Sequence, residues 1–348
     1  MAVTRLAILG STGSIGRQAL EVVQAHPDRL RVTRAGHRGD DLVALATADD
    51  VDLVLVATPG VAGLDATIAA LEAGKRVALA NKEVLVVGGH LVRYLCGGAG
   101  DRLRPIDSEH CALWQCLAGV DPSRVARITL TASGGPFRDL PLDELAAVTP
   151  ERALRHPTWR MGPKVTVDSA TLVNKAYEVI EAHWLYGVPY ERIGVVIHPE
   201  SVVHALVELV DGSVIAQLAE PDMRLPIQYA LLWEHAPSPA RRLDLERPLQ
   251  LGFRGAPDTR RYPSFDVVLS AARSGDTRAL IGVSAADEVA VERFLSGELP
   301  FGGIADVLRR GAAIARGPDG GAAPSLAEIH AIDRAARLAL SDAAVALG

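Results

Sequence analysis

The sequence predicts an α/β protein with an N-terminal Rossmann-like parallel-sheet domain, a central α+β domain and a C-terminal helical domain. Up to about residue 106, short apolar strands alternate with helical stretches, a rhythm typical of a parallel sheet with helices on both faces. A strand pair joined by a tight-turn dipeptide follows, and strand signals almost disappear from residue 264 onward. We place the domains at 1–106, 107–240 and 264–348, with an Arg- and Pro-rich linker at 241–263.

In the N-terminal domain, strands are expected where apolar residues run together, and helices where they recur at helical spacing. In chain order these elements are strand 6–9, helix 15–24, strand 31–35, strand 53–57, helix 64–73 and strand 77–80. The central domain should contain a long helix at 169–185 and a hairpin that turns at Asp211-Gly212. Its strands are 127–131, 195–198, 202–210 and 213–218, and the C-terminal helices are 264–273, 285–295, 304–315 and 325–347.

The overall charge limits the classes of partner. A net charge of −6 argues against nucleic acid or an anionic membrane, so an anionic ligand must be held by a local group of donors. No apolar stretch reaches the length of a bilayer, and the chain opens on a strand pattern rather than a leader segment. Cys96, Cys111 and Cys116 form no paired framework. We therefore expect a cytoplasmic protein.

Three glycines lie between the first expected strand and helix, in the run GSTGSIG at 10–16. Glycines there permit a tight turn and let the backbone approach a dinucleotide pyrophosphate at the helix N-terminus. A glycine-rich turn without a ligand is the alternative, because GxxGxxG spacing alone is weak evidence. After the second strand, Gly36, His37 and Arg38 stand where an acidic residue usually binds the ribose hydroxyls. A guanidinium there suits a 2′-phosphate and favours NADPH over NADH, although Arg38 can also be a solvated surface residue.

Carboxylates and short donors suggest a site for a metal ion and a phosphate. Asp107 and Glu109 flank Ser108, and residues i and i+2 of an extended chain face the same way, so the two carboxylates are expected to converge. The expected helix 169–185 has a polar face made of Thr171, Asn174, Lys175, Glu178 and Glu181. Without His or Cys at ligand spacing, such carboxylates select Mg²⁺ or Mn²⁺. A solvated stripe on an amphipathic helix is the alternative. Donors able to hold a phosphate are Ser133, Gly134, Gly135, Ser169, Asn174 and Lys175.

Taken together, these segments resemble the 1-deoxy-D-xylulose 5-phosphate reductoisomerase family along nearly the whole chain. The resemblance is carried by GSTGSIG (10–16), NKE (81–83), DSEH (107–110), TASGGPF (131–137), HPTWRMG (156–162), VDSATLVNKAYEVIEA (167–182), HPESVVH (198–204) and PDMR (221–224). The family isomerises 1-deoxy-D-xylulose 5-phosphate and then reduces the product with NADPH to 2-C-methyl-D-erythritol 4-phosphate. The resemblance therefore implies an isoprenoid-precursor enzyme with an NADPH-binding domain at 1–106 and a catalytic and dimerisation domain at 107–240.

The resemblance also implies roles for individual residues. The implied metal ligands, for Mg²⁺ or Mn²⁺ with Co²⁺ as a further candidate, are Asp107, Glu109 and Glu178. Catalytic roles fall to Lys82, Glu109 and His156. The phosphorylated sugar would be contacted by Lys82, Ser108, Glu109, Ser133, His156, Ser169, Asn174, Lys175 and Glu178. NADPH would be contacted by Thr12, Gly13, Ser14, Ile15, Gly36, His37, Arg38, Asn81, Glu83 and Gly162. Residues 155–163, with Trp159 and Met161, are expected to form a lid, and the alternative for Trp159 is a place in the core.

This sequence departs from the family pattern in three places. The stretch between the glycine loop and NKE is short, which predicts a smaller cofactor sheet, and His37-Arg38 replaces a lysine-led pair. The segment 284–288, Ser-Ala-Ala-Asp-Glu, replaces an Asn-rich version and is expected to affect packing more than chemistry. Family habit and the apolar hairpin at 202–218 together suggest a homodimer.

Two other functions compete with this interpretation. A semialdehyde-type dehydrogenase would need a nucleophilic cysteine, but Cys111 and Cys116 lie in an apolar pattern typical of a core. A dinucleotide-sensing regulator would bind NADPH without turnover, and the acidic charge together with the lack of a basic recognition helix disfavours it.

Overall fold

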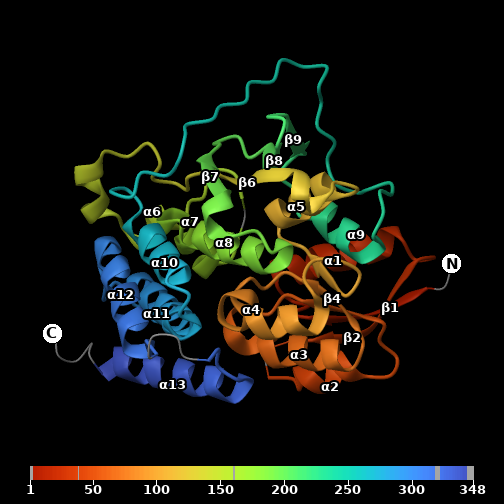
Figure 1. Cartoon of the computed structure of the whole chain (residues 1–348), viewed down its shortest axis with the longest axis horizontal. Coiled ribbons are helices and arrows are strands. Elements are labelled where there is room, and N and C mark those ends of the chain that lie inside the picture. Colours follow the sequence, from red (N-terminus) through yellow and green to blue (C-terminus); the bar gives the residue numbers. More distant parts are fainter. Residues whose placement is uncertain (1–2, 38, 160, 318–321, 343–348) are drawn as a thin grey trace.

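Figure 1 shows the computed structural model of the chain, which describes residues 3–37, 39–159, 161–317 and 322–342. A parallel α/β part, a mixed central part and a bundle of C-terminal helices meet around the middle of the molecule. The predicted fold class is confirmed. None of the described helices is both long enough and apolar enough to cross a membrane.

The N-terminal part holds a five-stranded sheet in the order β2-β1-β3-β4-β5, with every neighbouring pair parallel. Its strands are β1 (Thr4–Leu9), β2 (Leu30–Gly36), β3 (Leu53–Val56), β4 (Arg76–Leu79) and β5 (Leu103–Pro105). Its helices are α1 (Ser14–Ala25), α2 (Leu42–Thr47), the short 3₁₀ turn η1 (Gly60–Gly63), α3 (Leu64–Glu72) and α4 (Glu83–Cys96).

The two faces of this sheet are covered by helices from different parts of the chain. Leu6 and Ile8 of β1 pack with α1 in one core cluster, whereas Ala7 and Leu9 belong to the main core on the opposite face. This division follows from the alternation of side chains along a strand. The first cluster also includes Ile227 of α9 (Arg224–Leu232), a helix from far along the sequence. A later segment therefore completes the layer that carries the glycine turn.

The central part contains a four-stranded sheet in the order β7-β6-β8-β9, in which β6 and β7 are parallel and β8 and β9 are antiparallel to their neighbours. The expected hairpin is present, with Gly212 at φ +86° and Asp211 accepting a hydrogen bond of 2.9 Å from the backbone N–H of Ser213. The strands are β6 (Val125–Ala132), β7 (Ile193–Ile197), β8 (Val203–Leu209) and β9 (Val214–Leu218). The helical segments are α5 (Ser108–Leu117), η2 (Pro122–Arg124), η3 (Leu142–Ala147), α6 (Pro150–Ala153), α7 (Pro163–Thr171), α8 (Val173–Tyr186) and η4 (Tyr190–Arg192).

The prediction of a single long helix at 169–185 is wrong, because the helix is interrupted at Leu172 and divides into α7 and α8. Leu172 adopts the left-handed conformation at φ 58° and is 2% exposed, so its packed side chain stabilises a backbone shape that L-residues rarely take. No glycine or proline marks this break in the sequence. As a consequence, Ser169 and Asn174 lie on different helices and approach the site from different directions.

The C-terminal part is helical, as expected. Its members are α10 (Pro263–Arg273), α11 (Thr277–Leu295), the 3₁₀ turn η5 (Phe301–Gly303), α12 (Ile304–Ala315) and α13 (Leu326–Asp342). Helix α11 begins at Thr277, well before the expected residue 285, because Asp276 caps it by accepting hydrogen bonds from the backbone N–H groups of Arg278 and Ala279. The end of the expected helix 325–347 lies outside the described residues. Residues 233–262 contain no helix or strand and pass over the central sheet in Figure 1.

Candidate active site

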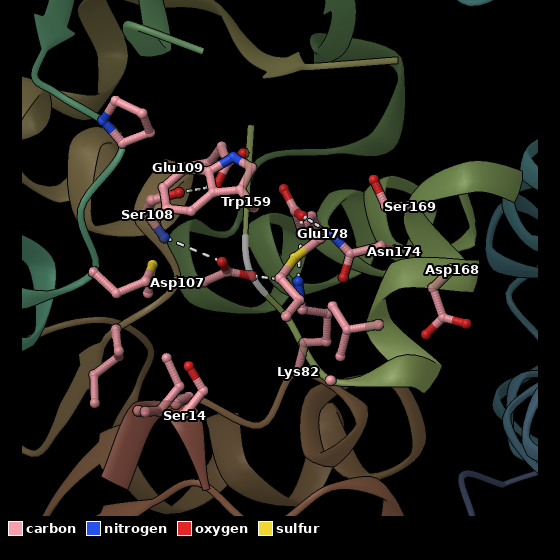
Figure 2. Close-up of a pocket in the computed structure, with 18 of the residues that line it drawn as sticks. Ser14, Lys82, Asp107, Ser108, Glu109, Trp159, Asp168, Ser169, Asn174 and Glu178 are labelled. Carbon is pink, nitrogen blue, oxygen red and sulfur yellow. Dashed lines mark hydrogen bonds and ion pairs between the residues drawn. The ribbon is translucent and has the colours of Figure 1, made fainter. Parts of the chain in front are cut away.

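A cavity of about 900 Å³ opens between the N-terminal and central parts, beside the carboxyl ends of β1, β3 and β4. Crevices at this edge of a parallel sheet are where ligands of such folds bind. The expected site residues that line it are Ser14, Ile15, Asn81, Lys82, Glu83, Asp107, Ser108, Glu109, Ser133, His156, Gly162, Ser169, Asn174, Lys175 and Glu178. Figure 2 shows that Ser14 lies across this cavity from Asp107 and Glu178.

The glycine turn brings the N-terminus of α1 to the cavity. Gly10 has φ +91°, and a side chain there would meet the carbonyl oxygen of Ala57 at 2.7 Å, so only glycine allows β1 and β3 to end this close together. Ser14 and Ile15 line the cavity, while Thr12 and Gly13 are exposed on the turn and do not line it. The exposed N–H groups of this first turn suit an anion.

The residues expected near the adenosine ribose lie beside the glycine turn rather than in the cavity. The carbonyl oxygen of Gly36 accepts hydrogen bonds from the N–H groups of Gly10 and Ser11, at 2.9 and 3.1 Å. His37 is exposed, with its Nδ1 3.1 Å from a carboxylate oxygen of Asp40. Arg38 lies outside the described residues.

Asn81 joins the ends of two strands at the cavity wall. It is 3% exposed, donates from Nδ2 to the carbonyl oxygens of Thr58 and Gly60, and accepts from the N–H of Val84 at 3.2 Å. These contacts bind the turn after β3 to the start of α4. The side-chain amide of Asn81 therefore fixes the backbone next to Lys82 and Glu83, which both line the cavity.

A cluster of carboxylates and lysines forms the centre of the cavity (Figure 2). Lys82 Nζ lies 2.5 Å from Asp107 Oδ2 and 3.2 Å from Glu178 Oε1. Lys175 Nζ lies 2.7 Å from Glu109 Oε1 and 2.5 Å from Glu178 Oε2. Glu178 is 1% exposed and Lys175 is 4% exposed, so the solvated stripe considered for this helix is wrong. Burying charged side chains this deeply costs free energy unless they pair with one another or with a ligand, so this face does not serve solubility.

The carboxylates of Asp107 and Glu109 do not converge in the expected way. Asp107 caps α5, accepting a 3.1 Å hydrogen bond from the N–H of Ser108, and Glu109 already lies inside that helix. The two-residue alternation of an extended chain therefore does not apply here. Glu109 turns to Lys175 and to the hydroxyl of Ser108, which donates to it at 2.5 Å, whereas Asp107 turns to Lys82.

Burial and charge act in opposite directions on these carboxylates. Burial raises the pKa of Glu178 to about 7, and the charge of Glu109 adds to this effect. Burial also opposes the ionisation of Glu109, but the ammonium of Lys175, His204 and the Ser108 hydroxyl together outweigh it and lower the pKa of that carboxyl. Three carboxylates beside two ammonium groups leave the fully ionised cluster with an excess negative charge, which favours an added cation.

His110 is a member of the cluster that the sequence analysis missed. Atoms of Asp107, His110 and Glu178 lie within 4.8 Å of one another, close enough to hold a metal ion. His110 is fully buried, its Nε2 is 2.8 Å from the carbonyl oxygen of Glu178, and its Nδ1 has no hydrogen-bond partner among the described residues. Asp107 Oδ2 likewise lacks a hydrogen bond of good geometry despite its ion pair with Lys82. Within the described part of the chain, the unpartnered Nδ1 of His110 beside the carboxylates of Asp107 and Glu178 fits a bound cation. The DSEH motif already contained His110 and was the available signal.

Glu181 and Thr171, the remaining members of the expected polar face, do not line the cavity. Glu181 is 1% exposed and its Oε2 lies 3.6 Å from His110 Nδ1. Thr171 is 5% exposed, and its hydroxyl donates to carbonyl oxygens of its own helix. Both side chains are therefore buried beneath the residues that line the cavity.

A second group of donors, which includes Ser133 and His156, also lines the cavity. His156 Nε2 lies 3.1 Å from Ser133 Oγ, while its Nδ1 accepts hydrogen bonds from the N–H groups of Thr158 and Trp159, at 3.1 and 2.8 Å. Because Nδ1 accepts, we place the proton on Nε2. Burial lowers the pKa of His156 to about 4, with a smaller contribution from Arg138. At neutral pH this imidazole is uncharged and can donate to an anionic group.

Trp159 is half-buried and lines the cavity, with its ring centroid 6.4 Å from that of His204. Figure 2 shows it beside Glu109, over the carboxylate cluster. The alternative of a place in the hydrophobic core is therefore disfavoured, and closure of 155–163 over a ligand stays a prediction. His204 of the HPESVVH segment also lines the cavity and was not among the expected site residues.

Cys111 and Cys116 offer no nucleophile. Burial raises the pKa of Cys111 to about 12 and that of Cys116 to about 11, and neither lines the main cavity. A thiol needs a lowered pKa to attack at neutral pH. This finding excludes both as the nucleophile of a semialdehyde-type dehydrogenase.

Family models match three regions of the chain. Residues 6–39 and 33–89 match 1-deoxy-D-xylulose 5-phosphate reductoisomerase, residues 103–186 match the C-terminal domain of 1-deoxy-D-xylulose 5-phosphate reductoisomerase, and residues 218–339 match a DXP reductoisomerase C-terminal domain. The chain is 47% identical to the 1-deoxy-D-xylulose 5-phosphate reductoisomerase of Thermomicrobium roseum, over 87% of this chain and 89% of that protein. It is 45% identical to the enzyme of the same name from Pelotomaculum thermopropionicum, over 95% and 96% of the two chains.

Solved structures give the same result. A crystal structure of DOX-P reductoisomerase in complex with NADPH, fosmidomycin and magnesium superimposes with a TM-score of 0.91 at 34% identity, over 99% of each chain. The 1-deoxy-D-xylulose 5-phosphate reductoisomerase of Zymomonas mobilis in complex with NADPH superimposes with a TM-score of 0.87 at 35% identity, again over 99% of each chain.

Proposed function

This chain belongs to the 1-deoxy-D-xylulose 5-phosphate reductoisomerase family, and from that membership we propose how its own residues carry out the reaction. The protein is an NADPH-dependent oxidoreductase that converts 1-deoxy-D-xylulose 5-phosphate to 2-C-methyl-D-erythritol 4-phosphate in isoprenoid-precursor biosynthesis, with a divalent metal ion as its second cofactor. The observation that carries the assignment of roles is the carboxylate–lysine cluster facing the glycine turn across one cavity.

We propose that Asp107, Glu109 and Glu178 hold the metal ion. Magnesium selects oxygen ligands, and bound there it would act as a Lewis acid toward the ketone and hydroxyl oxygens of the sugar. Glu109 would then turn away from Lys175, whose ammonium would keep its ion pair with Glu178 and would also donate to the substrate. A softer cation such as Co²⁺ would bring in His110 as a nitrogen ligand, and Mn²⁺ would be accepted by either set.

The remaining residues bind the sugar phosphate and exclude water. Lys82 places its ammonium beside the metal ligands, where it stabilises negative charge that develops on a substrate oxygen. The phosphate would be held by donors that line the cavity around the cluster, which are Ser133, His156, Ser169, Asn174 and Lys175. Trp159 would cover the sugar while bonds are rearranged, and the uncharged His156 fixes the segment that carries it.

The cofactor would lie across the N-terminal part. Its pyrophosphate would meet the first turn of α1 at Thr12, Gly13, Ser14 and Ile15, and Gly36, His37 and Arg38 would lie at its adenosine end. Asn81, Glu83 and Gly162 would face the nicotinamide, which supplies the hydride when NADPH is bound. We therefore assign cofactor binding to residues 1–106 and catalysis to residues 107–240.

We also propose a cytoplasmic homodimer joined through the hairpin of β8 and β9. Strand β9 is the edge of its sheet, and the hairpin exposes 68% of Val210, 55% of Val214 and 38% of Leu218. Apolar edge strands seldom stay uncovered in stable proteins. Sedimentation should give a dimer at micromolar concentration and a monomer for Val214→Lys/Leu218→Lys, and a monomeric wild type would reject this assembly.

A coupled assay with 1-deoxy-D-xylulose 5-phosphate, NADPH and Mn²⁺ or Mg²⁺ tests the proposed function. NADPH should be oxidised only when both substrate and metal are present. Binding of NADPH without turnover under these conditions would instead support the sensor.

A further inference from the structure

A second buried charge cluster borders the cavity at Glu83 and Asp168. Lys164 Nζ is 2.5 Å from Asp287 Oδ2, 2.7 Å from Asp168 Oδ2 and 3.3 Å from Glu83 Oε1. Its ammonium also lies 5.3 Å from the centre of the Tyr177 ring. Figure 2 shows Asp168 on α7, apart from Asp107 and Glu178, so this cluster is distinct from the metal-binding one.

This cluster joins the three parts of the molecule. Glu83 begins α4 of the N-terminal part, Lys164 lies in the first turn of α7, and Asp287 comes from α11 of the C-terminal helices. Asp287 belongs to the segment 284–288 that departs from the Asn-rich pattern of the family. Its neighbour Glu288 presses against the turn after β3, where a side chain on Gly60 would lie 2.6 Å from a Glu288 carboxylate oxygen. The C-terminal helices therefore contact the cofactor side directly.

The charges in this cluster depend on Lys164. Asp168 is 2% exposed, Asp287 is fully buried and Glu83 is 8% exposed, so three carboxylates share one ammonium. Burial and the charge of Asp287 raise the pKa of Asp168 well above its usual range, so Asp168 shares in holding a proton. Within the described part of the chain, Lys164 is the side chain that donates a hydrogen bond to the Glu83 carboxylate. Without this ammonium, Glu83 would lose its hydrogen-bond donor and the charge that does most to stabilise its ionised form in a poorly solvated place.

We propose that Lys164 is a positioning residue for NADPH: it holds the Glu83 carboxylate in place on the cavity wall, and Asp287 of the C-terminal helices fixes Lys164. Glu83 and Asp168 line the cavity and Lys164 does not, so Lys164 acts through these carboxylates, of which Glu83 is the proposed contact of the cofactor. The inference rests on the proposed contact between Glu83 and NADPH. It gives the C-terminal helices a part in cofactor affinity.

Direct titration of NADPH fluorescence tests the inference without requiring turnover. Lys164→Gln should raise the dissociation constant of NADPH roughly tenfold, equivalent to about 1.4 kcal/mol. The affinity for a phosphonate substrate mimic should change less than about twofold, and Lys164→Arg should recover most of the loss. Glu83→Gln should weaken NADPH binding by a similar factor, and adding Lys164→Gln to it should cost little more.

Lys75→Gln is the matched control. Lys75 is half-buried in the same part of the molecule and donates to the carbonyl oxygens of Ala48 and Val51, at 3.0 and 2.8 Å, away from the cavity. Its loss should lower thermal stability and leave the dissociation constant of NADPH unchanged. If Lys164→Gln fails to fold, Lys164→Gln/Asp287→Asn leaves two buried carboxylates instead of three and should show the same weakening of NADPH binding.

Three outcomes contradict the inference. Lys164→Gln that binds NADPH like the wild type overturns it, and so do fully additive effects of Lys164→Gln and Glu83→Gln. A wild type that binds no NADPH would reject the proposed function and this inference together. A wild type that binds NADPH but does not turn over 1-deoxy-D-xylulose 5-phosphate would reject the proposed function alone.

Discussion

Replacing Glu178 by glutamine separates metal binding from folding. The Glu178 carboxylate accepts hydrogen bonds from Asn174 at 2.5 Å and Lys82 at 3.2 Å, and Lys175 donates to its other oxygen at 2.5 Å. Glutamine keeps the volume and one acceptor oxygen, and it leaves two carboxylates beside two ammonium groups. Weaker hydrogen bonds are offset by the burial of one charge fewer, so the free energy of unfolding should change by about 1–2 kcal/mol. Unfolding entropy of about 2 cal/mol/K per residue, applied to 348 residues, makes this a Tm change of about 3 °C at most.

The effect on metal affinity should be far larger. Loss of one of three charged ligands should weaken divalent metal binding at least about 100-fold, because even partners outside the coordination shell contribute 10- to 100-fold. A metal concentration of about 100 times the wild-type Kd stabilises the wild type by about 2.7 kcal/mol, or roughly 4 °C. The variant should gain only about 0.4 kcal/mol under these conditions. Turnover should fall by at least about the same 100-fold factor as metal affinity.

Thermal melts of both proteins with EDTA and with Mg²⁺ or Mn²⁺ measure this difference. Glu72→Gln, at an exposed position on α3, is the matched control and should retain the metal-dependent rise in Tm. A Glu178→Gln protein that keeps the full rise and near-normal turnover would show that the metal is bound elsewhere. A variant that melts many degrees lower without metal would mean that the carboxylate is mainly structural.

The remaining predictions concern the cofactor end and the lid. Arg38→Ala should raise the NADPH Michaelis constant about 10- to 100-fold with little change for NADH, and equal losses with both cofactors would indicate a structural role. Trp159→Ala should lower kcat/KM sharply with little loss of Tm, whereas a core tryptophan would lose about 3–5 kcal/mol of stability. The pKa of His156 is about 4 in the folded state, which lies below its usual value. As the pH falls, the unfolded state therefore binds a proton at this histidine before the folded state does, and the folded state loses stability. Chemical denaturation should therefore find the stabilities of the wild type and His156→Gln converging between about pH 6.5 and pH 4, and parallel curves would contradict the burial of this imidazole.

The sequence predicted most of the fold because strands and amphipathic helices depend on local patterns. The break at Leu172 was missed because nearby side chains, rather than a local glycine, stabilise its left-handed backbone. Local patterns could not predict the position of α9 either, because this helix packs on the N-terminal sheet, whose strands lie far earlier in the sequence. Long-range packing decides both features.

Most of the expected site residues line one cavity, but the reason given for one pair was wrong. Asp107 and Glu109 reach the cavity from the start of α5, where a helix cap sets their directions, and not from an extended strand. His110 was overlooked because no His was counted at ligand spacing, although Asp107 and His110 lie three residues apart at the start of α5. The link between Lys164 and Asp287 joins residues far apart in the sequence, so no spacing rule can reveal it.

Product analysis of the coupled reaction tests the central claim most directly. The wild type, given 1-deoxy-D-xylulose 5-phosphate, NADPH and Mg²⁺ or Mn²⁺, should yield 2-C-methyl-D-erythritol 4-phosphate, with one NADPH oxidised per product formed. Removal of the metal with EDTA should stop the reaction, and restored metal should recover it. NADPH oxidation that yields another product, or the same rate with EDTA present, would contradict the account.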